Sequence, residues 1–214
     1  MCSSIQCPHD TTECSRWVSD QVGQLEHSSI SSKEEKLSTT SNTAAIPADD
    51  PRRNLVVANP DSSNALHLGV VGDTYTILLS GMDTAGRFTL IDMQIPPGGG
   101  PPPHRHDFEE AFILLDGELQ ATFRGETRSV RAGETVHIPA NALHQFHNAS
   151  SQPVRMLCIC SPAGQEEFFK ELGTLVATRI TPPPKVDAMQ EAAFIKKAME
   201  LAPKYRTELF KEAK

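Results

Sequence analysis

The sequence predicts an all-β protein with one barrel, preceded by a polar tail and followed by helices. Short runs rich in β-branched and aromatic residues, separated by Gly, Asn, Asp and Pro, recur between residues 54 and 160. The pattern changes to helical spacing after residue 160. With 38% hydrophobic residues in 214, the chain can fill one core of ordinary size.

Residues 1–51 are expected to form a disordered tail. This stretch is rich in Ser and Thr and shows no apolar periodicity, so it buries too little apolar surface to offset the entropy of the chain. Its Cys2, Cys7, His9 and Cys14 match no structural zinc spacing. The tail has neither the apolar region of a secretory signal nor the acid-poor composition of a transit peptide.

Residues 52–161 are expected to form the barrel. The expected strands are 55–57, 66–68, 74–79, 88–95, 111–115, 119–123, 127–130, 135–138, 145–147 and 154–160. Asp116-Gly117 predicts a hairpin between two of these strands. Residues 98–103 predict a loop, because their prolines cannot donate to a sheet.

Residues 162–214 are expected to form a helical extension. The first helix has an apolar face ending at Leu172, with Gly173 at its C-terminus. Asp187 is suited to cap a second helix, and residues 204–210 are expected to add further turns. The apolar stripe expected on the second helix is Ala188, Ala192, Ile195 and Met199. We expect these helices to cover the barrel exterior, a partner subunit or one mouth of the barrel.

Four metal-ligand side chains occur between residues 98 and 148. Alternate residues of an extended strand face the same side, so His104 and His106 share one face and Glu110 has the same parity. His144, on a later strand, is the natural fourth ligand. Three imidazoles and one carboxylate suit one divalent transition metal, and Fe, Mn, Ni, Co, Cu and Zn all remain open.

The same stretch resembles the two sequence motifs of the cupin superfamily. The first motif is matched by Gly98, His104, His106, Glu110 and Gly117. The second is matched by Gly133, Pro139, His144 and Asn148. Asn141 stands where the family usually has Gly, and Asn tolerates the left-handed backbone conformation better than most residues. The resemblance implies a double-stranded β-helix, or jelly-roll barrel, with His104, His106, Glu110 and His144 as metal ligands.

Such a metal retains open positions for Lewis-acid and template catalysis. Glu110 is the ligand able to accept a proton, which makes it the candidate catalytic base. The side chains expected to line the interior are Phe112, Leu114, Phe146 and Met156, which favour an apolar or aromatic small molecule. We expect the side chains of His137 and His147 to face the outside of the barrel. Those of Met156, Cys158 and Cys160 are expected to face its interior.

The segment after residue 160, with its Pro-rich continuation, resembles the small quercetin 2,3-dioxygenase-like single-domain cupins. That resemblance implies an oxidoreductase, a dioxygenase acting on a phenolic, flavonol-like or enolisable small molecule. Two alternatives remain open. One is a non-oxidative enzyme, such as an isomerase, decarboxylase or cyclase. The other is a non-catalytic cupin that binds a small molecule.

The net charge of −7 argues against nucleic acid or an anionic membrane as a partner. No run approaches the ~18 apolar residues of a membrane helix. Five cysteines without a disulfide framework favour a reducing, cytoplasmic location. The cupin resemblance implies a homodimer, with an exposed strand edge near residues 54–57 as the expected contact.

Overall fold

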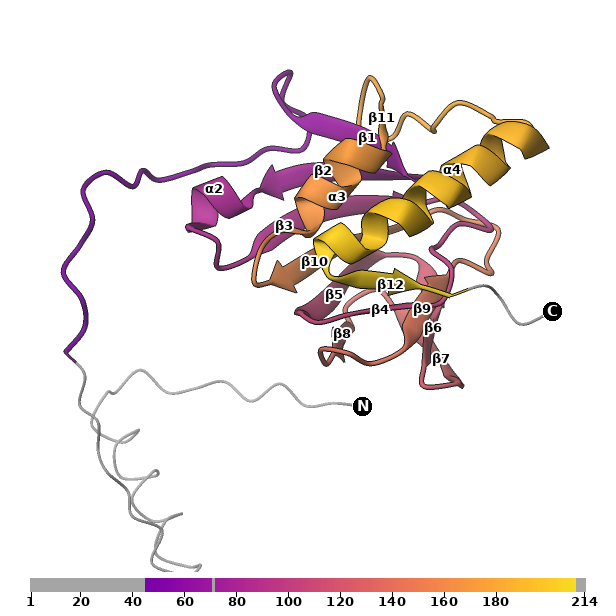
Figure 1. Ribbon diagram of the computed structural model, residues 1–214, viewed down its shortest axis with the longest axis horizontal. Helices are drawn as coiled ribbons and strands as arrows, with labels where there is room; N and C mark the ends of the chain where they lie inside the picture. Colours follow the sequence, from indigo (N-terminus) through magenta and orange to yellow (C-terminus); the bar gives the residue numbers. More distant parts are fainter. Residues whose placement is uncertain (1–44, 71, 211–214) are drawn as a thin grey trace, which may run out of the picture. The chain divides into compact units, whose positions relative to one another are not determined.

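The computed structural model describes residues 45–70 and 72–210, and the predictions for residues 1–44 lie outside this part of the chain. Residues 45–51 contain no helix or strand. From residue 66 onward the chain folds into two antiparallel sheets, with a few helices on the outside (Figure 1). The predicted all-β class is therefore confirmed.

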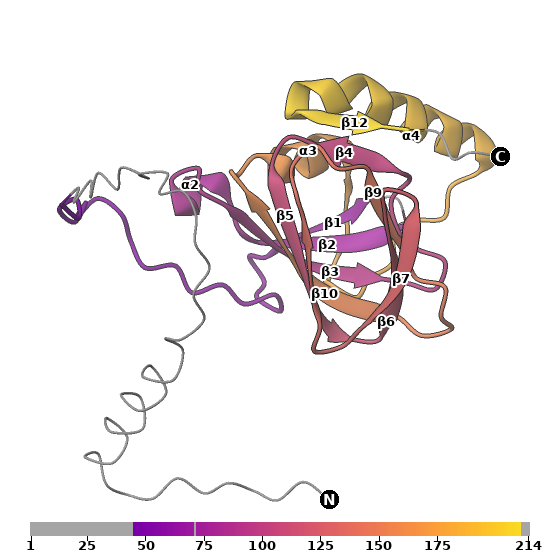
Figure 2. The ribbon, with the colours of Figure 1, turned by 90° about the horizontal axis from the view of Figure 1, so that it is seen from below.

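The larger sheet has seven strands. Their order is β11 (Thr174–Leu175), β1 (Leu66–Val70), β2 (Asp73–Leu79), β3 (Thr89–Ile95), β10 (Val154–Ser161), β5 (Glu109–Asp116) and β8 (Thr135–Ile138). The smaller sheet has five strands. Their order is β12 (Thr207–Leu209), β4 (His104–His106), β9 (His144–His147), β6 (Glu118–Phe123) and β7 (Glu126–Arg131). Figure 2 shows the two sheets closing around a common interior.

The core lies between the sheets and follows the alternation of inward and outward side chains. In β10, the inward residues Val154, Met156, Cys158 and Cys160 are all fully buried, whereas their neighbours are half-buried. Ile91 and Ile95 of β3 and Leu114 of β5 meet them from the neighbouring strands. Burying one such aliphatic side chain contributes about 1.5–3 kcal/mol, so these three strands form the centre of the barrel.

Helices α3 (Gln165–Leu172) and α4 (Ala188–Leu201) pack side by side outside the larger sheet (Figure 1). The predicted apolar face of α3 is confirmed, because Phe168, Phe169 and Leu172 are buried. The ring of Phe169 meets Tyr75 of β2 edge-on, with centroids 4.9 Å apart. Gly173 ends the helix as expected. Two short helices, α2 (Gly81–Thr84) and the 3₁₀ helix η1 (Ala202–Tyr205), complete the set.

The strand predicted at residues 55–57 is wrong. These residues adopt no regular structure, and Leu55 and Val57 are 92% and 85% exposed. β-branched side chains favour a strand only where another strand offers hydrogen bonds, and β11 occupies the outer edge beside β1 instead. The strand edge proposed there for a dimer contact therefore does not exist.

The hairpin predicted at Asp116-Gly117 is also wrong. β5 and β6 lie in different sheets, so this pair turns the chain from one sheet to the other. Gly117 has φ 81°, and a Cβ at this position would lie 2.9 Å from Cγ2 of Val154. Glycine is needed here because the backbone is left-handed and closely packed. A hairpin turn favours the same residue pair, which is why the sequence predicted a hairpin.

The apolar stripe predicted on α4 is exposed, with Ile195 at 51% and Met199 at 40%. The helix instead packs through Phe194, Ala198 and Leu201. The predicted cap is confirmed, because the Asp187 side chain accepts hydrogen bonds from the backbone N–H groups of Met189 and Gln190.

The helical turns predicted for residues 204–210 end at Tyr205. Arg206 adopts a left-handed conformation with φ 56°, which ends η1, and the chain then forms β12. β12 pairs with β4 at the edge of the smaller sheet. The extension at residues 162–214 therefore contributes strands to both sheets as well as helices. The boundaries proposed at residues 51 and 161 stay a prediction.

Candidate metal centre

His104 and His106 enter the barrel on β4, directly after a constrained loop. Gly98 and Gly100 have φ values of 80° and 131°, and a Cβ on Gly100 would collide with the carbonyl oxygen of Phe146. The loop is tied at its base, where the N–H of Gly98 donates to the carbonyl oxygen of Asn148. The two histidines point inward and are 8% and 3% exposed, while Arg105 between them is exposed. The prediction that they share one face is confirmed.

Glu110 reaches the same interior from the other sheet. The chain leaves β4 at His106 and begins β5 at Glu109, so residues 107 and 108 cross between the sheets. Glu110 is only 6% exposed, whereas Glu109 faces outward. The prediction that Glu110 points inward is correct. However, Glu110 does not share a strand with His104 and His106, so the alternation along one strand is not the reason.

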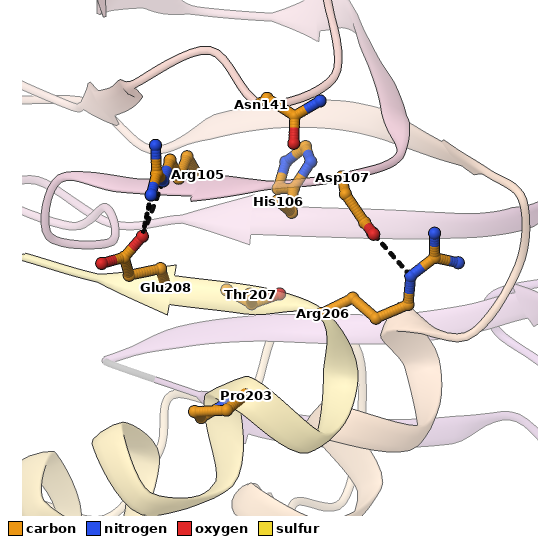
Figure 3. Close-up of a pocket in the computed structure, with 8 residues that line it drawn as sticks. All are labelled: Arg105, His106, Asp107, Asn141, Pro203, Arg206, Thr207 and Glu208. Carbon is orange, nitrogen blue, oxygen red and sulfur yellow. Dashed lines mark hydrogen bonds and ion pairs between the residues drawn. The ribbon is translucent and has the colours of Figure 1, made fainter.

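His144 begins β9, next to His104 on β4. The turn before it contains Asn141, whose φ of 66° confirms the expected left-handed conformation. The N–H of Asn141 donates to the carbonyl oxygen of His106, with an N–O distance of 2.6 Å. This hydrogen bond ties the two ligand-bearing segments together. The side chain of Asn141 also points toward His106 (Figure 3).

The four side chains converge on one point. Oε2 of Glu110 lies 3.2 Å from Nε2 of His106 and 3.1 Å from Nε2 of His144. The ring centroids of His104 and His144 are 4.2 Å apart. One ligand atom from each of the four residues lies within 4.8 Å of every other. The sequence-predicted set is therefore brought together as a buried group able to hold a metal ion.

The orientation of the imidazoles fits a cation. Nδ1 of each of the three histidines lies 2.9 Å from a backbone carbonyl oxygen, those of Pro102, Phe108 and Ala142. A carbonyl only accepts, so each Nδ1 carries a proton, and a ring in its neutral form turns an unprotonated Nε2 inward. Lone pairs on nitrogen then face the carboxylate oxygen of Glu110. This contact is unfavourable unless a cation or a proton lies between them.

The pKa values agree with this donor set. Burial, with the neighbouring His144, lowers the pKa of His104 to about 3, which keeps its imidazole neutral. Burial alone would raise the pKa of Glu110, but the imidazoles of His106 and His144 beside the carboxylate outweigh it and lower the pKa. Neutral imidazoles and an ionised carboxylate are the forms that ligate a metal.

Phe108 supports the site, and the sequence analysis did not predict this role. Its ring stacks on the imidazole of His106, with centroids 3.8 Å apart and planes at 3°. Its carbonyl oxygen also accepts the Nδ1 hydrogen bond of His106. An aromatic residue just after the two histidines is the available signal in the sequence, but spacing alone does not tell which face it occupies.

Two thiols lie behind Glu110. Sγ of Cys158 and Sγ of Cys160 lie 3.3 Å and 3.8 Å from Oε1, the carboxylate oxygen that faces away from the histidines. The prediction that Met156, Cys158 and Cys160 face the interior is confirmed, because all three are fully buried. A hydrogen bond with Cys160 and burial raise the pKa of Cys158 well above its ordinary value.

The other histidines of the part of the chain that the structure describes lie outside this group. His147 and His137 are exposed, as predicted, and His137 pairs with Glu109 on the outer face. His67 is buried on the larger sheet, where its Nδ1 lies 2.8 Å from the Thr76 hydroxyl. Asn148, the last residue of the second motif, donates to the carbonyl oxygens of Ile95 and Gln152. Its role is to fix the chain after β9.

A surface pocket of about 270 Å³ lies beside β4 and β12 (Figure 3). Its rim includes His106 but none of the other three residues of the buried group. Its charged residues pair off, with Nε of Arg105 2.6 Å from Glu208 and Nε of Arg206 2.7 Å from Asp107. The pocket therefore presents little unpaired charge. We take the buried donor group, and not this pocket, as the chemical centre.

Comparison with known proteins finds one family match, over the middle of the chain. Residues 91–160, which contain all four donor residues, match the family described as "Cupin domain". This part of the chain is therefore similar to a cupin domain, in agreement with the resemblance of the two motifs. Among the described residues, no helix has the length and apolarity needed to cross a membrane.

Individual relatives are distant. A quercetin 2,3-dioxygenase from Bacillus subtilis is 27% identical over 46% of this chain and 29% of its own length. Auxin-binding protein 1 from Arabidopsis thaliana is 35% identical over 35% of this chain and 42% of its own length. The crystal structure of the polyketide cyclase RemF from Streptomyces resistomycificus is 26% identical, with a TM-score of 0.43, over 49% of this chain and 80% of its own. The chain thus spans less than half of these two curated relatives.

Proposed function

We propose that this chain is a metal-dependent cupin oxidoreductase, a dioxygenase that acts on a phenolic, flavonol-like or enolisable small molecule. His104, His106, His144 and Glu110 are the proposed ligands of one divalent transition metal. The observation that carries the proposal is the buried group of three imidazoles around one carboxylate, in which each imidazole is fixed by an Nδ1 hydrogen bond. Ligand histidines held in this way are the usual arrangement of a metal site.

A metal bound there supplies a Lewis acid with open positions for a chelating substrate and for oxygen. The protein supplies a base beside those positions. Glu110 is ionised and buried, and its Oε2 faces the histidines, so its carboxylate is the proposed acceptor of a phenolic or enolic proton. A substrate with neighbouring oxygen atoms and one acidic hydroxyl matches both requirements.

The interior beside the ligands is apolar. Phe112 and Phe146 meet edge-on with centroids 5.3 Å apart, and Leu114 and Met156 are buried next to them. These side chains exclude water and favour flat aromatic surface over sugars or ions. This environment supports the proposed substrate class, as does the distant relationship to a quercetin 2,3-dioxygenase.

The first test is metal content of the purified chain, measured beside His106→Ala and His147→Ala. Both variants lose a histidine, but His147 is exposed and lies outside the donor group. We expect near one equivalent of metal in the wild-type protein and in His147→Ala, and a loss of most of it in His106→Ala. Equal metal content in all three proteins would overturn the proposed ligand set.

Oxygen uptake with flavonols and other enolisable phenols is the second test. Turnover with oxygen consumption supports the dioxygenase. Turnover without oxygen consumption, read by mass change of the product, identifies the isomerase, decarboxylase or cyclase alternative. Tight substrate binding without turnover identifies a binding module, the class suggested by the similarity to an auxin-binding protein.

We place this activity in the cytoplasm and propose a homodimer. Two free, buried cysteines suit a reducing compartment. The dimer is tested by sedimentation of the full chain at micromolar concentration, where a monomer would contradict it.

A further inference from the structure

A second group of metal-type donors lies on the far side of Glu110. It consists of Cys158 and Cys160 of β10 and Oε1 of Glu110. The two sulfurs are 3.6 Å apart, and they lie 3.3 Å and 3.8 Å from the carboxylate oxygen. Both cysteines are free and fully buried.

The closeness of the two sulfurs requires explanation. Residues two apart on one strand are about 6.6 Å apart along the backbone, and parallel side chains would keep that separation. Cys158 and Cys160 instead lean together until their sulfurs are 3.6 Å apart. Both turn toward Oε1 of Glu110, so the three atoms form a compact triangle.

This triangle has the size of one face of a tetrahedral metal site. Zinc binds sulfur at about 2.3 Å and carboxylate oxygen at about 2.0–2.2 Å. Tetrahedral angles then separate two sulfurs by about 3.8 Å, and sulfur from oxygen by about 3.5 Å. The three observed separations of 3.6, 3.3 and 3.8 Å fall around these values.

We propose that Cys158, Cys160 and Oε1 of Glu110 form a second cation site, for a thiophilic tetrahedral ion of the zinc class. Binding forms two metal–sulfur bonds and one metal–oxygen bond, and each thiol releases its proton to the solvent. Three protein ligands leave the fourth position open.

The two sites share only Glu110, which presents Oε2 to the histidines and Oε1 to the thiols. The thiol site does not depend on the proposed dioxygenase activity. An ion held by the thiols would draw on the same carboxylate that serves as the proposed base. A zinc-class ion bound at the second site would therefore reduce the ability of Glu110 to accept a proton.

The test uses Cd²⁺ as the probe, because cadmium thiolates absorb in the ultraviolet and the ¹¹³Cd chemical shift reports sulfur ligation. The starting protein is the full chain with Cys2, Cys7 and Cys14 replaced by Ser, so that two cysteines remain. We expect a thiolate absorption that saturates with one Cd²⁺ per chain, and a ¹¹³Cd signal shifted by sulfur ligands. Two protons per chain should be released in weak buffer.

Three variants of that protein decide the outcome. Cys158→Ser with Cys160→Ser should abolish the absorption, and either single change should weaken Cd²⁺ binding by at least tenfold. His106→Ala should keep the absorption, which separates this site from the histidine site. Thermal unfolding of each variant shows whether it is folded.

No thiolate absorption in the starting protein would overturn the second site and leave the histidine site untouched. Absorption that survives the double change would overturn it as well. If the double variant does not fold, protection is measured instead. Cd²⁺ should slow alkylation of both thiols in the starting protein at least tenfold, and unchanged alkylation rates would contradict the proposal.

Discussion

Asp73 and Glu110 are buried carboxyl groups at opposite ends of β3, and their surroundings move their pKa values in opposite directions. Glu110 pairs with Cys160, which in turn pairs with Thr89 at the start of β3. Asp73 directly precedes Thr74, which pairs with Gln94 near the end of β3. Burial raises the pKa of Asp73 to about 8, and the Tyr75 hydroxyl and the backbone N–H of Gly100 oppose it only in part. For Glu110, the two neighbouring imidazoles of His106 and His144 outweigh burial and lower the pKa.

The difference lies in what each oxygen atom meets. Both oxygens of Glu110 face donors or metal-type ligands, with imidazoles on one side and thiols on the other. Oδ1 of Asp73 has no hydrogen-bond partner among residues 45–70 and 72–210. Burial with few partners therefore keeps the Asp73 carboxyl group neutral. Burial beside imidazoles keeps the Glu110 carboxyl group charged. Four substitutions test this contrast.

Glu110→Gln should have the largest effect. It keeps the shape of the side chain but removes the charge that binds a cation, at a cost of about 3–5 kcal/mol in binding free energy. Metal content should fall at least about tenfold, as measured by elemental analysis. Glu109→Gln, one residue away on the outer face, is the matched control and should keep its metal. Equal loss in both variants would contradict a special role for Glu110.

Asp73→Asn should change how stability depends on pH. The folded protein keeps a proton on Asp73 up to about pH 8, whereas the unfolded chain releases it near 3.8. The wild-type free energy of unfolding should therefore fall as pH rises between these values, by up to about 6 kcal/mol from this group and by about 4 kcal/mol between pH 5 and pH 8. Denaturant unfolding at pH 5 and pH 8 measures it. The variant should show a smaller fall, and an identical fall would refute the raised pKa.

Phe108→Leu should have a smaller effect on the Glu110 end. Leucine preserves burial but removes the ring stacked on His106. Loss of the stacked pair costs about 1 kcal/mol in stability, and a less rigid ligand lowers metal affinity about tenfold. Calorimetric metal titration checks the affinity. Unchanged affinity would mean that the Nδ1 hydrogen bond of His106 is sufficient to hold its ring.

Glu109→Gln should have the smallest effect on stability. Glu109 and His137 are 53% and 62% exposed, although the carboxylate lies only 2.6 Å from the imidazole. Water screens such a pair, so the change in unfolding free energy should stay within about 1 kcal/mol. A larger loss in denaturant unfolding would show that this outer pair also holds β5 to β8.

The donor residues were predictable because their spacing is local. His104 and His106 alternate on one strand, and Asn141 has the left-handed conformation that its position requires. The strands with alternating apolar residues, such as β10, were also predicted to within one residue. In these cases a few neighbouring residues contain the physical information, namely side-chain direction and backbone strain.

The errors arose where a distant partner decides the outcome. Residues 55–57 have strand-forming side chains but no neighbouring strand. Gly117 permits a turn, but packing against Val154 turns the chain into the other sheet. The burial of Phe194 in place of Ile195 depends on how α4 meets the structure beneath it. The contact of Cys158 with Glu110 likewise joins residues 48 apart.

β12 has a consequence for how the protein matures. Without it, β4 would be the edge of its sheet, and the strand carrying two of the proposed ligands would be paired on one side only. The segments that complete this edge are joined by contacts between residues as far apart as 99 and 103 positions. On a ribosome, β4 emerges long before β12 does. The edge of β4 can therefore be paired on both sides only after β12 has been synthesised.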